Sequence, residues 1–239
     1  MSQFVVEKSF WELFPNAEIG VVLAKEINNT DEGTSSVRPS IISLLEQNHH
    51  EAKKFLIEEI LSENPVISVW REAYRKFKTK KGARSSIEAL LKRVVSGKGV
   101  GSINPLVDIY NAVSLQFGLP CGGEDIDAFQ GNLRLTMTQG KDPFLALGDE
   151  ADDPTLPDEI CYLDDAGAVC RCLNWRDGQR TMLTENTKNA FLVIESVDHE
   201  RHKDFREALD TLAESTKKYL GGTTIIEILN RNKTEINLG

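Results

Sequence analysis

The sequence predicts an α+β protein in which a mixed, sandwich-like β core carries packed helices. Apolar residues recur at helical spacing in segments between residues 40 and 97, and they alternate at a spacing of two from Asn132 to Thr138. Residues 190–197 form an apolar run with one carboxylate, as in a buried strand. A chain of 239 residues can bury a substantial core. We expect one domain over residues 1–239, with a helical part over about 1–103, a core over about 104–230, and most strands after Asn132.

One strand and three helices are predicted in the N-terminal part. In chain order we expect a buried strand over 18–27, a polar loop over 28–39, a helix over 40–62, a second helix that starts at Asn64-Pro65, and a third helix that Ser85 or Ser86 caps and Gly97 ends. The second helix carries an aromatic stripe of Trp70, Tyr74 and Phe77. Such a stripe is typical of core packing rather than of a platform that stacks bases.

The C-terminal part is predicted to be rich in strands. In chain order we expect strands over 132–138, 160–163 and 168–175, the last two joined by a turn at 164–167, then a strand over 190–197, a helix over 200–220 that Gly221-Gly222 ends, and a last strand over 223–229. We expect the polar tail from Asn230 onward to be frayed.

The stretch from Asn104 to Asp127 joins a capped helix to a glycine pair. Asn104 can cap the helix, and Asn104, Asp108 and Asn111 form a polar stripe at helical spacing. We interpret Gly122-Gly123 as a loop whose backbone can approach a ligand closely. The stretch therefore predicts one wall of a pocket. The alternative is a capped helix with a solvated side and a flexible loop.

Three motifs in this stretch resemble the B3/B4 editing domain of the phenylalanyl-tRNA synthetase beta subunit. They are Asp108-Ile-Tyr-Asn111, Gly118-Leu-Pro120 and Asp125-Ile-Asp127. The resemblance covers about residues 70–200, and the chain is more similar to free-standing proteins built from this domain than to a synthetase. It implies the fold of that domain and an amino-acid pocket.

The resemblance also places the pocket residues. Asn111 matches the pocket asparagine, Asn174–Gly178 stands where the family has a glycine-rich loop, and Thr184, Thr187 and Glu195 follow in the family's order. Two positions depart from the pattern: the family's pocket histidine falls on Gly122, and Trp175 adds bulk. The family's tyrosine specificity is therefore not transferred. The substrate-binding candidates are Asn104, Asp108, Asn111, Gly122, Gly123, Asn174, Trp175, Arg176, Gly178, Thr187 and Glu195.

Two of these places suggest chemistry without the resemblance. Trp175, Arg176 and Arg180 could stack a terminal base or hold a phosphate, although a β-turn with surface arginines would look the same. Glu195 interrupts an apolar strand, where a carboxylate is costly unless it is paired or faces a cavity. The structural alternative is an ion pair between Glu195 and Arg171 or Arg176.

Charge is distributed unevenly along the chain. The net charge of −9 disfavours strong nonspecific binding to nucleic acid, and we expect no DNA partner. Residues 71–93 hold nine basic residues against two acidic ones, whereas residues 121–165 hold twelve acidic residues against two basic ones. We interpret Lys78, Lys80, Lys81 and Arg84 as a rim that contacts RNA phosphates. The alternative is a pair of solvated helices with a lysine-rich loop.

Several classes of protein lack support in the sequence. No run of about 18 apolar residues is present, and the start lacks the features of a signal peptide, so we expect a cytoplasmic protein without a membrane partner. The four cysteines lack zinc-site spacing, and we interpret the histidine pairs 49/50 and 199/202 as solvated helix residues. We therefore expect no metal and no cofactor.

The function implied by the resemblance is proofreading in trans, in which the ester of a misacylated aminoacyl-tRNA is hydrolysed. Such a reaction depends on orientation of the ester and a water, so it needs no strong protein base. The sequence has no nucleophile elbow, phosphate loop or zinc-hydrolase motif. The expected partner is the aminoacylated 3′ end of a tRNA, or a small amino-acid-like ligand. The alternative is a noncatalytic module that binds RNA or an amino acid, and aminoacylation itself is not expected.

Overall fold

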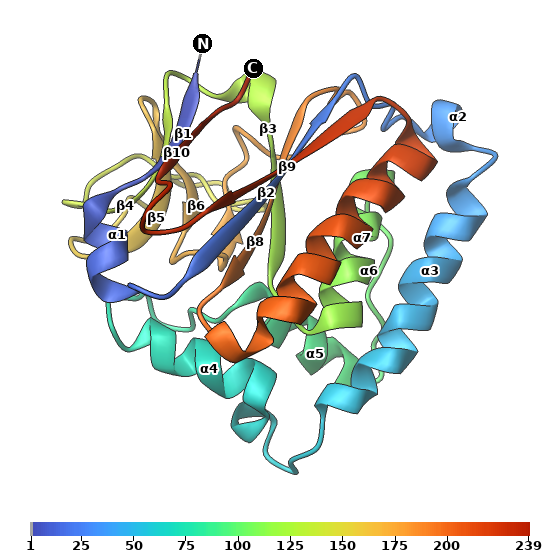
Figure 1. Ribbon diagram of the computed structural model, residues 1–239, viewed down its shortest axis with the longest axis horizontal. Coiled ribbons are helices and arrows are strands. Elements are labelled where there is room, and N and C mark those ends of the chain that lie inside the picture. The colour runs from blue at the N-terminus through green and yellow to red at the C-terminus, as the bar shows by residue number, and fades with distance from the viewer. Residues whose placement is uncertain (1) are drawn as a thin grey trace.

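In the computed structural model, which describes residues 2–239, two β-sheets face each other and helices surround them (Figure 1). The strands are β1 (Gln3–Val6), β2 (Glu18–Lys25), β3 (Cys121–Asp125), β4 (Leu133–Met137), β5 (Ile160–Asp164), β6 (Gly167–Arg171), β7 (Arg176–Asp177), β8 (Ala190–Ser196), β9 (Thr223–Leu229) and β10 (Glu235–Asn237). The α-helices are α1 (Lys8–Leu13), α2 (Asp31–Thr34), α3 (Arg38–Glu51), α4 (Pro65–Tyr74), α5 (Ser86–Val95), α6 (Pro105–Phe117) and α7 (His202–Leu220). Short 3₁₀ helices span Ala52–Phe55, Leu61–Glu63, Ile126–Ala128 and His199–Arg201.

The two sheets differ in strand direction. The larger sheet has the order β10-β1-β4-β5-β6-β7, and its strands are antiparallel except for the parallel pair β1 and β4. The smaller sheet has the order β3-β8-β2-β9 and is antiparallel throughout. The predicted α+β class with a mixed β core is therefore confirmed.

Aromatic side chains fill the space between the sheets. Phe4 of β1 and Tyr162 of β5 come from the larger sheet, and Phe191 of β8 comes from the smaller one. The rings of Phe4 and Phe191 meet edge to face, with centroids 5.0 Å apart. All three side chains are buried, so the sheets form the predicted sandwich-like core.

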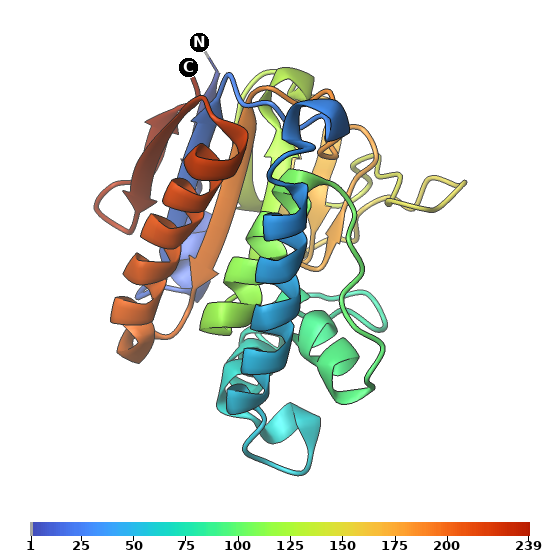
Figure 2. The ribbon, with the colours of Figure 1, turned by 90° about the vertical axis from the view of Figure 1, so that its right-hand side faces the viewer.

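Helices cover the outer face of the smaller sheet. Figure 2 shows α6 and α7 on this face, with α3 packed against α6. Gly20 in β2 allows α7 to approach, because a Cβ atom there would lie 2.5 Å from a methyl carbon of Leu209. Helix α7 is amphipathic, and its Phe205, Leu209 and Leu212 side chains are buried against the sheet.

Both ends of the chain are more ordered than the sequence suggested. Strand β1 and helix α1 were not predicted, and the expectation of a frayed tail was wrong, because β10 pairs with β1 at the edge of the larger sheet (Figure 1). Ile236 and Leu238 are buried by this pairing. The β core also begins well before Asn132, because β1, β2 and β3 lie within the two sheets. A strand of three or four residues is too short to show a period, so only its partner defines it.

Most of the other predicted elements are present with shifted ends. The helix expected over 40–62 ends at Glu51, and two 3₁₀ turns follow it. The chain leaves the helical conformation at Leu56, and Ile57 and Ile60 are exposed rather than packed. The aromatic stripe of α4 lies in the core, as predicted. Within residues 2–239, no helix combines the length and apolar character needed to cross a membrane.

A buried ion pair secures the larger sheet. Arg171 of β6 is fully buried and donates two hydrogen bonds to Glu159, at 3.0 and 2.7 Å. Its remaining Nη1 donates to the Asp153 backbone oxygen at 2.6 Å. Glu159 is also fully buried, so each charge depends on the other.

Replacing Arg171 with Met should lower the free energy of unfolding by about 3–5 kcal/mol, because the Glu159 carboxylate would stay buried without its partner. Urea unfolding measures the loss. The control is Arg75→Ala, which breaks a pair with Glu72 whose side chains are 72% and 65% exposed, and it should change little. Equal losses for the two variants would contradict the structural role of Arg171.

Candidate functional site

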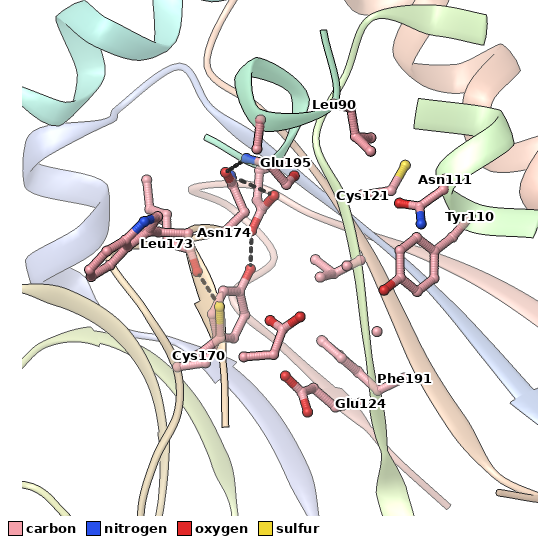
Figure 3. Close-up of a pocket in the computed structure, with 18 of the residues that line it drawn as sticks. Leu90, Tyr110, Asn111, Cys121, Glu124, Cys170, Leu173, Asn174, Phe191 and Glu195 are labelled. Atoms are coloured by element: carbon pink, nitrogen blue, oxygen red, sulfur yellow. Dashed lines mark hydrogen bonds between the residues drawn. The ribbon is translucent and has the colours of Figure 1, made fainter. Parts of the chain in front are cut away.

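A cavity of about 190 Å³ lies between the sheets, next to α5 and α6 (Figure 3). Strands β3, β5, β6 and β8 and the turn after β6 form its inner walls. The lining residues are Ser86, Ala89, Leu90, Arg93, Tyr110, Asn111, Cys121, Gly122, Gly123, Glu124, Tyr162, Cys170, Leu173, Asn174, Trp175, Asp177, Phe191, Val193 and Glu195.

Glu195 is held by two neutral donors inside this cavity. The Tyr162 hydroxyl donates to Oε1 of Glu195 at 2.8 Å, and the Asn174 amide donates to Oε2 at 3.1 Å (Figure 3). Glu195 is 1% exposed. The alternative of an ion pair with an arginine is wrong, because Arg171 pairs with Glu159 and Arg176 pairs with Asp149.

The turn after β6 directs Asn174 toward Glu195. Cys172 and Leu173 both have positive φ, at 49° and 60°, a conformation that residues other than glycine rarely adopt twice in a row. The backbone N–H of Ser86, at the start of α5, donates to Oδ1 of Asn174 at 3.2 Å. A backbone N–H can only donate, so this contact fixes the amide with its NH₂ group toward Glu195.

Burial raises the pKa of Glu195 to about 7, and the hydrogen bonds from Tyr162 and Asn174 limit the rise. Near neutral pH the group therefore exists in both protonation states. A carboxyl group with such a pKa can accept or release a proton beside a bound ligand.

Two further carboxyl groups, which were not among the predicted site residues, line the cavity. Glu124 of β3 is 4% exposed, and Asp177 of β7 is partly buried. Burial raises the pKa of Glu124 well above its usual range, and the neighbouring Asp177 raises it further. In the sequence Asp177 lies within the predicted pocket loop 174–178 and Glu124 directly follows the glycine pair, but neither carboxyl group was named as a site residue. Tyr110 and Tyr162 were also missed as lining residues, because buried tyrosines carry no sequence signal that separates a cavity wall from a core.

The glycine pair belongs to a strand and not to the expected loop. Gly122 and Gly123 lie in β3 and pair with Val193 and Leu192 of β8. A Cβ atom on Gly123 would lie 2.7 Å from a Leu192 methyl carbon, so the strand needs glycine there to approach its neighbours. A Cβ atom on Gly122 would meet only Val193, at 3.8 Å, which leaves that side of the cavity open.

The structure brings six of the eleven substrate-binding candidates to this cavity. They are Asn111, Gly122, Gly123, Asn174, Trp175 and Glu195. The site residues and their expected roles remain predictions, but these side chains and glycines do converge on one concave surface, as the sequence suggested.

Asn104 and Asp108 hold the start of α6 in place and do not line the cavity. Asn104 accepts the Val107 N–H at 3.0 Å, as a helix cap does. Asp108 is fully buried, and it accepts the Ser102 hydroxyl at 2.7 Å and pairs with Arg38 at 3.1 Å. The polar stripe of α6 therefore divides, and only Asn111 faces the cavity.

The other three candidates also lie outside the cavity lining. Thr187 donates to Asp125 at 2.7 Å and organises the turn before β8. Arg176 is exposed and lies over the Trp175 ring, with its guanidinium carbon 5.9 Å from the ring centroid. Gly178 packs against the backbone of β6, where a Cβ atom would lie 3.1 Å from the Val169 oxygen.

The basic segment borders a second concavity of about 470 Å³ between α4 and α5. Arg84 lines it together with Arg71, Arg75 and Lys92, and Ser85 at its edge precedes Ser86 of the first cavity. Lys78 and Lys81 are exposed nearby, whereas Lys80 pairs with Asp153. We call this basic concavity the α4–α5 groove. Within residues 2–239, no group of three or more His, Cys, Asp or Glu side chains could hold a metal ion.

The fold and cavity define a β-sandwich protein with a small, partly open cavity, whose mostly apolar lining carries the carboxyl groups of Glu124, Asp177 and Glu195. Residues 69–221 match the family model of the B3/4 domain, so the chain belongs to the B3/4 domain family. The resemblance stated from the sequence is thus confirmed.

Two curated relatives are similar to part of this chain. The chain is 33% identical over 99 residues to the phenylalanine–tRNA ligase beta subunit of Idiomarina loihiensis, and the match covers 39% of this chain and 12% of the relative. It is 32% identical over 98 residues to the same subunit of Psychrobacter arcticus, covering 41% and 12%. The matched part is thus about an eighth of the length of these relatives.

One solved structure is similar over most of the chain. It is an N-terminal fragment of the phenylalanyl-tRNA synthetase beta subunit from Pyrococcus horikoshii, with 12% identity and a TM-score of 0.49. The match covers 98% of this chain and 53% of the fragment.

Replacing Glu195 with Gln should change how stability depends on pH. Because the Glu195 pKa is raised to about 7 from its usual 4.5, the folded protein binds more protons than the unfolded one in this window, and stability falls as the pH rises through it. The variant cannot titrate there. Relative to the wild type, its free energy of unfolding should rise by about 3 kcal/mol from pH 4 to pH 8, at about 1.4 kcal/mol per pKa unit.

Urea unfolding at several pH values measures this difference, and Glu185→Gln, at an exposed position, is the matched control. Parallel stability curves for wild type and Glu195→Gln would show that Glu195 titrates normally.

Proposed function

We propose that this protein binds the aminoacylated 3′ end of a tRNA and hydrolyses the ester bond of a misacylated tRNA. The observation that carries the proposal is the Glu195 carboxyl group, held by Tyr162 and Asn174 within a cavity of about 190 Å³ in a B3/4 domain. The relatives that contain this domain are named as ligases for phenylalanine and its tRNA. That kinship supports a site for an amino acid attached to tRNA.

The size of the cavity separates the two parts of such a substrate. An amino-acid side chain fits the cavity, whereas the tRNA must stay outside. The rim is formed by α5, where Ala89 and Arg93 are exposed, and by the partly exposed Trp175. Trp175 offers an aromatic face to the terminal base. The ester then lies at the rim, next to Asn111 and the open side of Gly122.

Hydrolysis at this place relies on orientation. Holding the ester and a water in a reactive geometry can supply much of the rate, and the neighbouring ribose hydroxyl of the substrate can assist. The cavity thiols are unsuited to nucleophilic attack, because burial raises the pKa of Cys121 and of Cys170 well above the usual range. Glu195 orients the amino acid and exchanges a proton near neutral pH.

The α4–α5 groove offers a path for the tRNA backbone. Within residues 2–239, Arg84 and Lys92 form no ion pair with an acidic side chain, whereas Arg71 in the same groove pairs with Glu88. The groove adjoins the cavity at Ser85 and Ser86. Free cations beside a site for the 3′ end suit phosphate groups in an otherwise acidic protein.

A noncatalytic module that binds an amino acid or RNA is the second candidate. Gly122 favours it, because this position carries a histidine in the pocket of the resembled synthetase domain. Gly122 supplies no side chain to the ester.

Incubation with a panel of charged tRNAs should accelerate the loss of at least one aminoacyl ester over the rate in buffer. Glu195→Gln should lower that rate by about 10–100-fold, the equivalent of one hydrogen bond to a charged group. Retention of RNA without faster hydrolysis of any charged tRNA would instead support the noncatalytic module.

Replacing Arg84 and Lys92 with Ala should weaken tRNA binding and flatten its dependence on salt, by about 0.7–0.9 in slope for each lost phosphate contact. Filter binding between 50 and 200 mM salt measures this slope. Lys8→Ala on α1, which lines neither concavity, is the control. Unchanged slopes would place the RNA elsewhere. The adjacent predicted contacts, Lys78, Lys80 and Lys81, can be tested in the same way.

A further inference from the structure

We propose that the inner end of the cavity, formed by Glu124 and Asp177, selects an amino acid whose side chain carries a positive charge, as an ammonium or guanidinium group does. This inference rests on the proposed function, because it assumes that an amino acid attached to tRNA enters the cavity. It adds a specificity determinant that the motif residues do not contain.

Glu124 has an unused hydrogen-bonding atom. Its side chain projects from β3, is 4% exposed, and lines the cavity. Within residues 2–239, its Oε2 atom has no hydrogen-bond partner of good geometry. The buried Thr181 hydroxyl, which also lacks a partner, is the protein donor that opposes the rise in the Glu124 pKa. A buried carboxyl oxygen without a donor is costly, and native proteins rarely retain one without a reason. A donor carried by a ligand would satisfy it.

Glu195 differs from Glu124 in its hydrogen bonding. Each of its oxygens already accepts a hydrogen bond, from Tyr162 and from Asn174. Figure 3 shows the Glu124 carboxyl group at the other end of the cavity from the Glu195–Asn174 pair, near Phe191 and Cys170. Both oxygens of Glu195 thus have a hydrogen-bond donor from the described part of the protein, whereas Oε2 of Glu124 has none of good geometry.

No protein cation is free to neutralise the inner end within residues 2–239. Asp177 is the charged neighbour that most raises the Glu124 pKa, and Arg180 is the cation that opposes it. Both arms of Arg180 donate to Asp164, at 2.7 and 2.8 Å. The other titratable groups that face this end are Tyr110 from α6, Tyr162 from β5 and Cys170 from β6. These groups are neutral or negatively charged, so they cannot replace a cation.

The α-ammonium group and the side chain of the substrate would lie at different depths in the cavity. The exposed residues of the lining, Ala89 and Arg93, lie on α5, whereas Glu124 is almost completely buried. Because the tRNA stays outside, the ester and the α-carbon remain near α5. The part of the amino acid that reaches Glu124 is the end of its side chain. There the aromatic rings of Tyr110 and Phe191 also suit a cation.

Proton linkage supports this assignment. Burial and the neighbouring Asp177 raise the pKa of Glu124 well above the usual range. A bound cation favours the ionised carboxylate, so its affinity should increase as the pH rises through the pKa of this group. A neutral ligand of the same shape has no such requirement.

The test compares pairs of ligands that differ in side-chain charge and little in shape. Adenosines carrying an aminoacyl group through a 3′-amide resist hydrolysis, and calorimetry measures their binding. The wild type should bind the arginyl and lysyl compounds at least tenfold more tightly than the citrullyl and Nε-acetyllysyl compounds. Glu124→Gln should reduce that preference by about 10–100-fold, as for a lost hydrogen bond to a charged group, and Glu185→Gln should preserve it. Asp177→Asn, at a less buried position, is a second variant that avoids a change in the core, and it should also reduce the preference.

Equal affinity of the wild type for charged and neutral partners would overturn the inference. A second result would also overturn it: N-acetylation of the arginyl compound abolishes binding, while removal of the side-chain charge has no effect. Glu124 and Asp177 would then hold the α-ammonium group and not the side chain. Ester hydrolysis of arginyl-tRNA and phenylalanyl-tRNA is measured separately. Hydrolysis without preference for charge refutes this inference alone, whereas preference for charge in binding without any hydrolysis refutes the catalytic proposal alone.

Discussion

The burial of the Glu195 carboxyl group without a cation constrains the whole site. Its two donors come from the opposite sheet: Tyr162 lies in β5, and Asn174 follows β6. Asn174 is in turn fixed by Ser86 at the start of α5. One acidic group thus ties both sheets and a helix together around an open space. Burying this carboxyl group without a cation costs free energy that an apolar side chain would not cost, and a ligand is the reason that our proposal gives for it.

Acidic side chains line the inside of the site, and basic side chains lie in the groove beside it. Three carboxyl groups, from Glu124, Asp177 and Glu195, line the cavity. Arg84 and Lys92 lie in the adjoining α4–α5 groove. A ligand with a positive group at one end and phosphates at the other matches this arrangement. An aminoacyl-tRNA has that polarity, since its amino acid carries the positive charge and its nucleotides carry the negative charge.

The sequence was informative where a local pattern decides the structure. Alternation identified β4, the apolar run identified β8, and capping residues identified the start of α6 at Asn104. It failed where distant partners decide. Glycine is disfavoured in strands, yet Gly122 and Gly123 are strand residues because β8 pairs with them. Glu124 was not selected as a site residue, because it is buried by residues from other elements, which its neighbours in the sequence do not reveal.

The central claim is that the cavity around Glu195 holds the amino acid of an aminoacyl ester. A crystal structure with an uncleavable 3′-aminoacylamino-adenosine tests it most directly. The account predicts the amino-acid side chain between the sheets, directed away from α5, with the ribose at the rim beside Trp175. Density for the compound at another surface, or an empty cavity at saturating concentration of a compound that binds in solution, would contradict it.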